Sequence, residues 1–386
     1  MIDFKTWLTN IPRQYRTHQN ADLSLEEYLN IYKEEFKKVR IGCSFAPDLV
    51  EQMYRLENGK QTITVEQKVK LLKVLIHDLG MRDIRLGVKW NKVINSKGKF
   101  DFSYYHPYLD YCLSHNVAVC LNVGPIKTFG WPEEYIPDSI LEKVKHSGIV
   151  VDTTTKLAKH AFEYLEMLLK HIKTTYTKEQ LQYVKIIQPE NEAFNVFGKH
   201  RVVLQNDYLY EIIKKIVAVF PNKKILLTSA ETRDTRKIHH LIERCVTDGI
   251  KGKNFIVGIN YYNLPSFLKV PKLGPVDDIT VSNFLQSRTH TMNIHTSRRM
   301  GFKIEVTEAQ FEQWGRAYLS PGNSHHEAKY LFDRIVENTL DPQTDGLIRL
   351  WGFERYAKKK LEQTLTQDHQ MNLKLIHAIN SKNFLC

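Results

Sequence analysis

The chain has 386 residues, of which 42% are hydrophobic and 25% are charged, a balance typical of a soluble globular protein. Its formal charge of +12 invites a polyanionic partner, but the lysines and arginines are scattered, and the densest basic run is Lys358-Lys359-Lys360. We find no RRM, zinc-finger or helix-turn-helix pattern and no apolar run of about 18 residues, so we expect neither a nucleic-acid-binding nor a membrane-spanning protein.

We expect residues 1–39 to form an N-terminal helical extension that packs on one domain of residues 40–386. Ser24 and Glu27 have the spacing of a capping box and predict one helix in this extension. The N-terminus has no basic segment followed by an uninterrupted apolar one, so we expect no secretory signal and a cytoplasmic protein. The five cysteines are widely spaced, odd in number and without a CxxC pair, which favours free buried thiols over disulfides or a zinc site.

Eight short runs of β-type residues follow one another along the chain, separated by longer amphipathic stretches. The predicted strands are Ile41–Phe45, Asp83–Lys89, Val117–Val123, Val184–Gln188, Lys224–Thr228, Phe255–Asn260, Phe302–Thr307 and Gly346–Trp351. The apolar spacing between them predicts helices after the Thr64/Gln67 capping box, over Tyr104–His115, Thr154–Thr175, Asp207–Val219, Thr235–Val246 and Val281–Met300, after the Ser324/Glu327 capping box, and over Leu361–Ile379.

This strict alternation of strand and helix predicts an α/β fold with a parallel sheet covered by helices. Eight such units closing on themselves predict a single (β/α)8 barrel, the TIM-barrel fold. An open doubly wound sheet is the competing arrangement. We favour the barrel because no GxGxxG or GxxxxGK[ST] loop follows the first strand.

In such a barrel the active site is built at the carboxyl ends of the strands. Two acidic segments fall there: Gln188-Pro189-Glu190-Asn191-Glu192 after the fourth strand and Thr307-Glu308 after the seventh. Glycoside hydrolysis needs a pair of carboxyl groups, one to protonate the departing oxygen and one to attack the anomeric carbon or activate water. The residues alone do not separate Glu190 from Glu192, because the strand alternation cannot be followed past Pro189.

The alternation along the seventh strand favours Glu308 as one member of the pair. Phe302, Ile304, Val306 and Glu308 share one face, which predicts an apolar interior face that ends in a carboxylate at the barrel mouth. The same alternation directs Glu305 outward, towards the helices, in a structural role.

Two further residues extend this pair to a candidate site. Arg85 lies on the second strand, and a guanidinium that points into a barrel needs an anionic partner, for which an ionised nucleophile is suited. Trp351 ends the eighth strand, where an indole ring can stack on the apolar face of a sugar. Taken alone, each charged residue could be a surface charge and Trp351 could be a core residue. The interpretation as an active site therefore depends on their joint placement at strand ends.

These segments resemble glycoside hydrolase clan A, the barrels with catalytic carboxylates on strands four and seven that include the cellulase-like family 5 enzymes. The closest resemblance is to bacterial cellulase-like proteins of unassigned substrate, and it runs from about Ile41 to about Tyr356. The motifs that carry it are Asp78-Leu79-Gly80-Met81 before Ile84-Arg85-Leu86, then Trp131-Pro132-Glu133, Gln188-Pro189-Glu190-Asn191-Glu192, Thr307-Glu308-Ala309-Gln310 and Leu350-Trp351-Gly352-Phe353-Glu354.

The resemblance implies a retaining glycosidase that hydrolyses a β-linked sugar by double displacement, with no metal or organic cofactor. Glu192, directly after Asn191, matches the acid/base, Glu308 matches the nucleophile, and Arg85 matches the nucleophile's partner. Asn191 would bind the sugar 2-hydroxyl, and Trp351 would form the floor beneath the reacting sugar.

The resemblance also implies residues around the substrate, which would be an oligosaccharide or glycoside. Tyr262, or with less support Tyr261, would donate a hydrogen bond to Glu308. Trp131 and Trp314 would form outer stacking platforms for further sugar units.

The chain departs from the clan pattern beside both carboxylates. Ala193 follows Glu192 where the clan has proline, and Glu312-Gln313-Trp314-Gly315 stands where many relatives have Glu-Pro-Trp-Gly. Asn122 or Lys127 occupies the region where some family 5 enzymes place an imidazole. A catalytically weak carbohydrate-binding barrel and a transglycosidase with the same pair are the alternatives, and the sugar, the linkage and the oligomeric state are left open.

Overall fold

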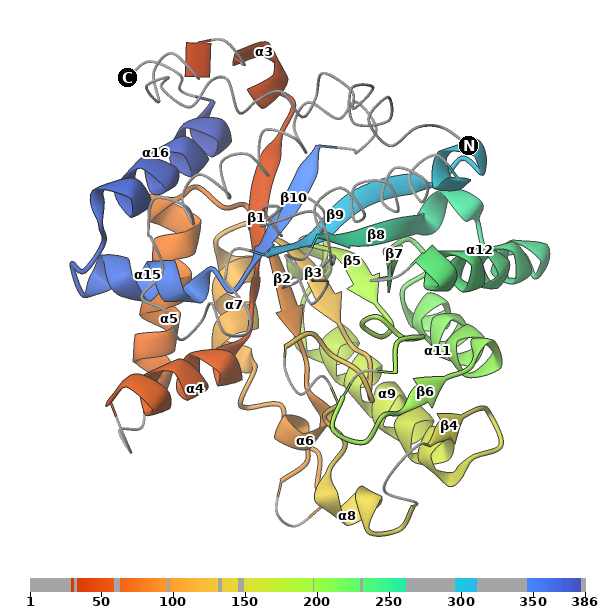
Figure 1. Cartoon of the computed structure of the whole chain (residues 1–386). Helices are drawn as coiled ribbons and strands as arrows, with labels where there is room; N and C mark the ends of the chain where they lie inside the picture. Colours follow the sequence, from red (N-terminus) through yellow and green to blue (C-terminus); the bar gives the residue numbers. More distant parts are fainter. Residues whose placement is uncertain are drawn as a thin grey trace, which may run out of the picture.

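Eight parallel strands close into a barrel in the computed structural model of the chain (Figure 1). The structure describes residues 29–30, 33–58, 63–95, 98–130, 134–144, 149–196, 198–229, 232–261, 296–310 and 346–382. In the order in which they pair, the strands are β1 (Arg40–Phe45), β10 (Leu347–Trp351), β9 (Lys303–Gln310), β8 (Phe255–Tyr261), β7 (Lys224–Ser229), β5 (Val184–Gln188), β3 (Ala118–Asn122) and β2 (Asp83–Gly87). All eight predicted strands and the (β/α)8 barrel are therefore confirmed.

The first and last strands close the barrel by pairing with each other. Arg40 aligns with Leu347 and Cys43 with Leu350, while the other edge of β1 pairs with β2, where Phe45 aligns with Leu86. Figure 1 shows this closure as the red β1 beside the blue β10. All carboxyl ends consequently lie at one end of the barrel, which we call the mouth.

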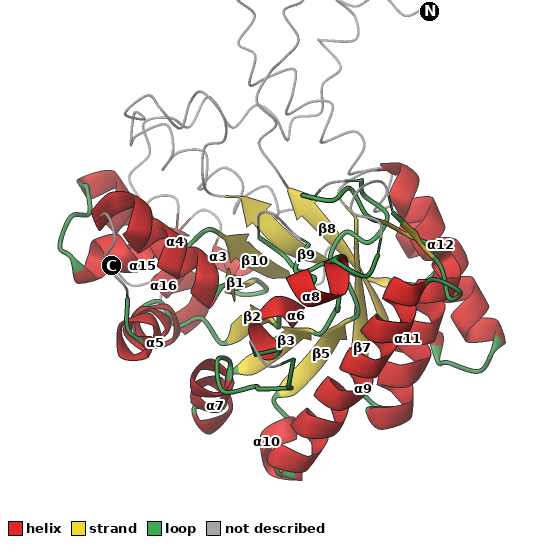
Figure 2. Cartoon of the chain, turned by 90° about the horizontal axis from the view of Figure 1, so that it is seen from below, coloured by secondary structure: helices red, strands yellow, loops and turns green. Residues whose placement is uncertain are grey.

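Helices surround the strands on the outside (Figure 2). The longer ones are α4 (Pro47–Asn58), α5 (Val65–Lys73), α7 (His106–Ser114), α9 (Lys156–Thr175), α11 (Asn206–Val219), α12 (Thr232–Thr247), α15 (Glu354–Leu361) and α16 (Gln367–Ser381). Shorter helical segments are α3 (Lys33–Phe36), α6 (Trp90–Val93), α8 (Asp138–Leu141), α10 (Lys178–Leu181), the 3-10 turn Gly252–Asn254 and the π-helical turn Val74–Asp78 that continues α5. Among the described residues, none of the helices is both long and apolar enough to cross a membrane.

The helix predictions are confirmed in part. The Thr64 hydroxyl accepts a hydrogen bond from the backbone of Gln67 at 3.2 Å, and the Gln67 side chain accepts one from the backbone of Thr64 at 2.8 Å, so the predicted capping box is present. The helix predicted over 361–379 is present as α16, but it begins at Gln367 after a cap at Thr366, and Leu361 is instead the last residue of α15, which was not predicted.

Other predicted and unpredicted segments complete the fold. The helices predicted after Ser24 and Ser324, and most of the one predicted over 281–300, lie outside the described residues. Of the predicted extension 1–39, residues 29–30 and 33–39 are described, and they include α3. The helix α4 and the short parallel pair of β4 (Val150–Val151) and β6 (Val203–Leu204) were not predicted.

The barrel strands have two faces with different contents. Strand residues that face outward, such as Ile84, Val119, Ile187 and Val306, form one apolar core with the surrounding helices. A second, much smaller apolar cluster is formed by Cys120, Ile186, Leu226 and Ile256, from four successive barrel strands, and it fills part of the interior.

The interior also holds a group of charged residues from β2, β9 and β10, which we call the lower cluster: Asp83, Glu305 and Arg349. Arg349 donates from Nε to Asp83 at 2.6 Å and from Nη1 to Glu305 at 3.0 Å, and Lys303 donates to Glu305 at 3.1 Å. Because β1 separates β2 from β10, these side chains can meet only inside the barrel. The prediction that Glu305 points towards the helices is therefore wrong.

A β-bulge on β9 is the physical reason for this error. Ile348 of β10 aligns with Val306, but Leu350 aligns with Ala309, so β9 contains one residue more than its partner over this stretch. On the other edge, Gly258 aligns with Glu305 and Asn260 with Glu308. The extra residue shifts the alternation, so that Glu305 and Glu308 both face the interior while Val306 faces the helices.

Candidate active site

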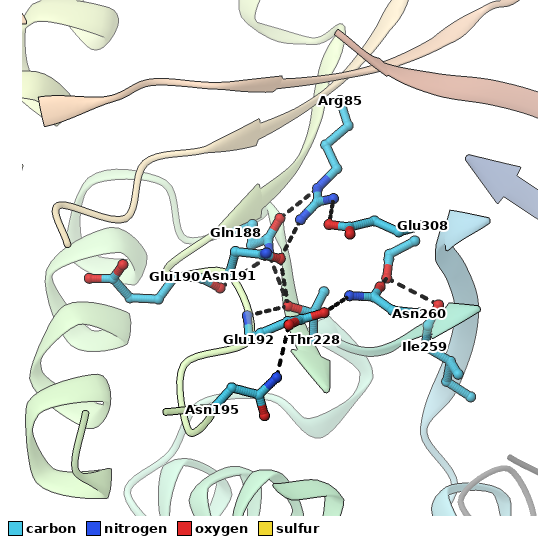
Figure 3. Close-up of polar contacts among 11 residues, drawn as sticks. Arg85, Gln188, Glu190, Asn191, Glu192, Asn195, Thr228, Ile259, Asn260 and Glu308 are labelled. Carbon is cyan, nitrogen blue, oxygen red and sulfur yellow. Dashed lines mark hydrogen bonds and ion pairs between the residues drawn. The ribbon is translucent and has the colours of Figure 1, made fainter. Parts of the chain in front are cut away.

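Arg85 stands at the centre of the polar contacts at the mouth. It is completely buried; Nε donates to Gln188 at 2.8 Å, Nη2 donates to Asn191 at 2.7 Å, and Nη1 forms an ion pair with Glu308 (Figure 3). The guanidinium carbon also lies 4.4 Å from the centre of the Phe129 ring. The guanidinium is thus held on its donor edges and on one face, and it is the side chain that joins β2, β5 and β9 across the mouth.

The side-chain oxygen of Asn191 is the shared acceptor of this region. In addition to the Arg85 bond, Asn191 Oδ1 accepts from Gln188 Nε2 and from Thr228 Oγ1, each at 3.1 Å. Thr228 Oγ1 in turn accepts from Gln188 Nε2 at 3.0 Å and from the backbone nitrogen of Glu192 at 2.9 Å. We call Arg85, Gln188, Asn191, Thr228 and Glu308 the upper cluster.

Glu192 faces this cluster from the turn that follows β5. Both of its carboxyl oxygens are held by amides: Asn260 Nδ2 donates to Oε1, and Asn195 Nδ2 donates to Oε2 at 2.8 Å (Figure 3). Asn260 is fixed by Thr307, whose hydroxyl donates to Asn260 Oδ1 at 2.5 Å, and it is the register partner of Glu308 on β8. Asn260 therefore holds the Glu192 carboxylate from the position on β8 that aligns with Glu308 on β9.

Glu190, the other candidate at this strand end, points away from the mouth (Figure 3). Its carboxyl group accepts from the backbone nitrogens of Ile126 at 3.2 Å and Lys127 at 2.6 Å, and from the hydroxyl of Tyr208 at 2.9 Å. Burial raises the pKa of Glu190 to about 8, although these donors and the Lys127 charge act in the opposite direction. A Cβ on Gly124 would lie 2.4 Å from this carboxylate, so glycine is required for the close approach.

Several contacts join the loop after β3 to the loop after β5, and we call them the loop clamp. The buried Lys127 donates through Nζ to the backbone oxygen of Asn195, and its own backbone oxygen accepts from Asn191 at 3.0 Å. Glu134 accepts from two backbone nitrogens of the second loop, those of His200 and Val202. Together with the Glu190 contacts, the clamp fixes the backbone from which Asn191 and Glu192 project.

The remaining predicted site residues are described only in part. Trp351 is 8% exposed and packs with Phe129 and Ala46 beside the mouth, next to the ring that covers Arg85. Tyr262, Trp131 and Trp314 lie outside the described residues. Within the described ranges there is no group of three or more His, Cys, Asp and Glu side chains that could hold a metal ion.

Three polar residues of the site were not predicted: Thr228, Asn260 and Asn195. Thr228 and Asn260 each end or nearly end a predicted strand, so the rule that barrel sites lie at carboxyl ends could have identified them. Asn195 lies three residues after Glu192. Its backbone nitrogen donates to the backbone oxygen of Glu192 at 2.9 Å, and this turn brings the side-chain amide of Asn195 back to the Glu192 carboxylate.

No protein-family model matches the chain, and no curated protein sequence matches it. Solved structures do. Native xylanase 10B from Thermotoga maritima superposes with a TM-score of 0.53 at 11% identity, covering 94% of this chain and 100% of the xylanase. A GH5-4 broad-specificity endoglucanase from Clostridium longisporum gives 0.51 at 12% identity, covering 90% and 98%, and a fungal β-1,4-galactanase gives 0.50 at 11% identity, covering 87% and 98%. At these identities the similarity shows a shared barrel fold over nearly the whole chain.

Proposed function

We propose that the chain is a clan A glycoside hydrolase that cleaves a β-linked sugar with retention, with Glu192 as acid/base and Glu308 as nucleophile. The observation that carries this proposal is the pair of carboxylates at the mouth, each 2% exposed: Glu308 lies on the seventh barrel strand, and Glu192 follows the fourth and is bound by Asn260 of the neighbouring strand β8. Xylanase, endoglucanase and galactanase barrels of the same fold support the same class of chemistry.

The different surroundings of the two carboxylates suit different roles. Glu308 forms an ion pair with the buried Arg85, which favours a carboxylate that attacks the anomeric carbon. Glu192 is oriented by two neutral amides, which suits a group that first donates a proton to the leaving oxygen and then accepts one from water. Retention requires the carboxyl groups to be about 5–5.5 Å apart when substrate is bound.

Asn191 is oriented to bind the sugar. Its side-chain oxygen already accepts from three donors, so its amide N–H groups are the part available for a hydroxyl of the substrate. We propose that Asn191 donates to the 2-hydroxyl, that Trp351 lies beneath the reacting sugar, that Tyr262 donates to Glu308, and that Trp131 and Trp314 stack on outer sugars. The substrate class is a β-linked glycan or its oligosaccharides.

Covalent trapping tests this proposal directly. The chain would be incubated with activated 2-fluoro β-glycosides of glucose, xylose, galactose and mannose, digested, and analysed by mass spectrometry. We expect one of the sugars to label Glu308, which identifies both the nucleophile and the preferred glycone. Labelling at another carboxylate, or turnover of aryl β-glycosides that is unchanged in Glu308→Gln, would overturn the assignment.

A further inference from the structure

The backbone of Glu192 adopts a conformation that is rare for a residue with a side chain. Its φ angle is 42°, in the left-handed region that glycine occupies readily and other residues mostly avoid. Such conformations persist only where surrounding contacts hold them, and they concentrate at functional sites. Something in the structure must therefore hold residue 192 in place, and it must act on the backbone.

Thr228 provides this contact from the carboxyl end of β7. Its hydroxyl oxygen accepts a hydrogen bond from the backbone nitrogen of Glu192 at 2.9 Å (Figure 3). The threonine is 3% exposed, so water does not compete for this bond. On the neighbouring strand, a Cβ on Gly258 would lie 2.9 Å from the Thr228 methyl group, so the methyl lies close against the Gly258 backbone.

The hydroxyl of Thr228 uses its full hydrogen-bonding capacity. A hydroxyl has one donor and two acceptor positions. Thr228 donates to Asn191 Oδ1 at 3.1 Å and accepts from Gln188 Nε2 at 3.0 Å and from the Glu192 nitrogen. The Thr228 hydroxyl therefore ties the backbone nitrogen of Glu192 to the side chains of Asn191 and Gln188, in addition to the contacts of the loop clamp.

We propose that Thr228 is a positioning residue for the acid/base: it holds the strained backbone of Glu192 so that the carboxyl group faces the glycosidic oxygen between Asn195 and Asn260. This inference rests on the proposed function. Without the hydroxyl, the buried N–H of Glu192 loses this acceptor, and residue 192 relaxes towards an ordinary backbone conformation that turns the carboxyl group away.

A positioning role for Thr228 has a kinetic signature that a general structural role lacks. Protonation by Glu192 matters only when the leaving group is poor, because a good leaving group such as 2,4-dinitrophenolate departs without a proton. Misplacing Glu192 should therefore slow glycosides with poor leaving groups selectively. A variant that merely loosens the barrel should slow both kinds of substrate alike.

The test compares Thr228→Val, which keeps the shape and removes the hydroxyl, with Thr228→Ser, which keeps the hydroxyl. Phenyl and 2,4-dinitrophenyl β-glycosides of glucose, xylose, galactose and mannose are the probes, with Glu192→Ala as the reference. For the valine variant we expect kcat/KM to fall about 100-fold on the phenyl glycoside, at the lower end of what general acid catalysis contributes, and much less on the dinitrophenyl glycoside, where only the lost bond to Asn191 contributes. The serine variant should stay close to wild type on both.

A buried threonine elsewhere supplies a matched control. Thr235 on α12 donates to the Ser229 hydroxyl at 3.4 Å, so Thr235→Val removes a comparable buried hydroxyl outside the site and should affect both substrates equally. If Thr228→Val does not fold, as judged by circular dichroism, Thr228→Ala takes its place with the same expected leaving-group dependence.

The outcomes separate this inference from the function on which it rests. Equal losses on both substrates, or wild-type rates on both, in the hydroxyl-free Thr228 variant would overturn the positioning role. If Glu192→Ala itself shows no leaving-group dependence, or wild type turns over none of the probes, the proposed function fails first. Selective loss in Thr228→Val together with retention in Thr228→Ser supports both.

Discussion

Two arginines lie buried in the same barrel, and their surroundings are different. In the lower cluster Arg349 donates to two carboxylates, those of Asp83 and Glu305, and Glu305 forms a second ion pair with Lys303. In the upper cluster Arg85 donates to one carboxylate, Glu308, and to two neutral amide oxygens.

This difference shows that buried arginines can have different roles at two depths of one barrel. In the lower cluster the arginine is paired with carboxylates. Burial acts to lower the pKa of Arg349, but the nearby Asp83 and Glu305 carboxylates outweigh it and raise that pKa. In the upper cluster the amides replace a second carboxylate, so the guanidinium orients neutral side chains as well as balancing one negative charge. We infer that the lower cluster stabilises the barrel and that the upper cluster organises chemistry.

Replacing Glu308 with glutamine should give the largest effect and separate the two clusters most clearly. The amide keeps the shape but cannot attack the anomeric carbon, so we expect kcat/KM on an aryl β-glycoside to fall by more than about 10⁴-fold. Glu305→Gln on the same strand should keep its activity within a small factor. Comparable activity losses in the two variants would remove the distinction between the clusters.

Replacing Arg349 with methionine should lower the stability of the protein and leave its kcat unchanged. This change leaves Asp83 and Glu305 buried without their main counter-charge, and breaking such a pair typically costs about 3–5 kcal/mol of stability. Denaturant unfolding would measure the loss, and the kcat of the protein that remains folded should be unchanged. A loss of kcat without a loss of stability would show that the lower cluster contributes to catalysis.

Glu190 lies next to Asn191 in the chain but outside the upper cluster, and its titration tests whether it is a neutral, buried structural group. Because burial raises its pKa to about 8, from 4.5 for the free side chain, the native state binds a proton more tightly than the unfolded state does. Its contribution to stability is therefore complete below about pH 4.5 and is lost as the pH rises through about 8. In Glu190→Gln the decline in unfolding free energy over this range should disappear; an unchanged slope would show that Glu190 is already ionised.

The smallest effect concerns the acid stability of the lower cluster. Burial acts to raise the pKa of Glu305, but Arg349 and Lys303 outweigh it and lower the pKa below 4.5. The folded pKa is depressed, so this contribution is present above pH 4.5 and is lost as the pH falls through the folded value. Below pH 4.5 the unfolding free energy should thus depend less on pH in Glu305→Gln than in wild type. The same pH dependence in both proteins would contradict the ion pairs of Glu305 with Arg349 and Lys303.

The eight strands could be predicted because each is a short β-type run between helical patterns. The closed barrel followed from the presence of eight such alternating units. The faces of β9 could not be predicted, because a β-bulge adds one residue without a mark in the sequence and reverses the alternation between Val306 and Glu308. The break before α16 was missed for another reason: the residue that completes its capping box with Thr366 is His369, where the usual signal is glutamate or glutamine.

The candidate site divides in the same way. Arg85, Glu308 and Glu192 follow from strand ends and a family resemblance, and the structure places them around one mouth. The amides and the hydroxyl that orient them could not be ranked from the sequence, since Asn260, Asn195 and Thr228 acquire importance only through contacts between separate strands and turns. The strand alternation could not separate Glu190 from Glu192, because it does not give the course of the chain after Pro189; the resemblance at Asn191-Glu192 made that choice.

The loop clamp has a consequence for how this barrel can be modified. Barrel enzymes commonly vary by exchange of single loops at the mouth, because each loop is anchored to its own strand. Here Lys127 and Glu134 bind the backbone of the following loop, while Glu190 binds the backbone of the preceding one. The two loops therefore have to be transferred together: grafting either alone onto another barrel would leave buried lysine and glutamate side chains without these partners, whereas grafting both would carry the partners with them.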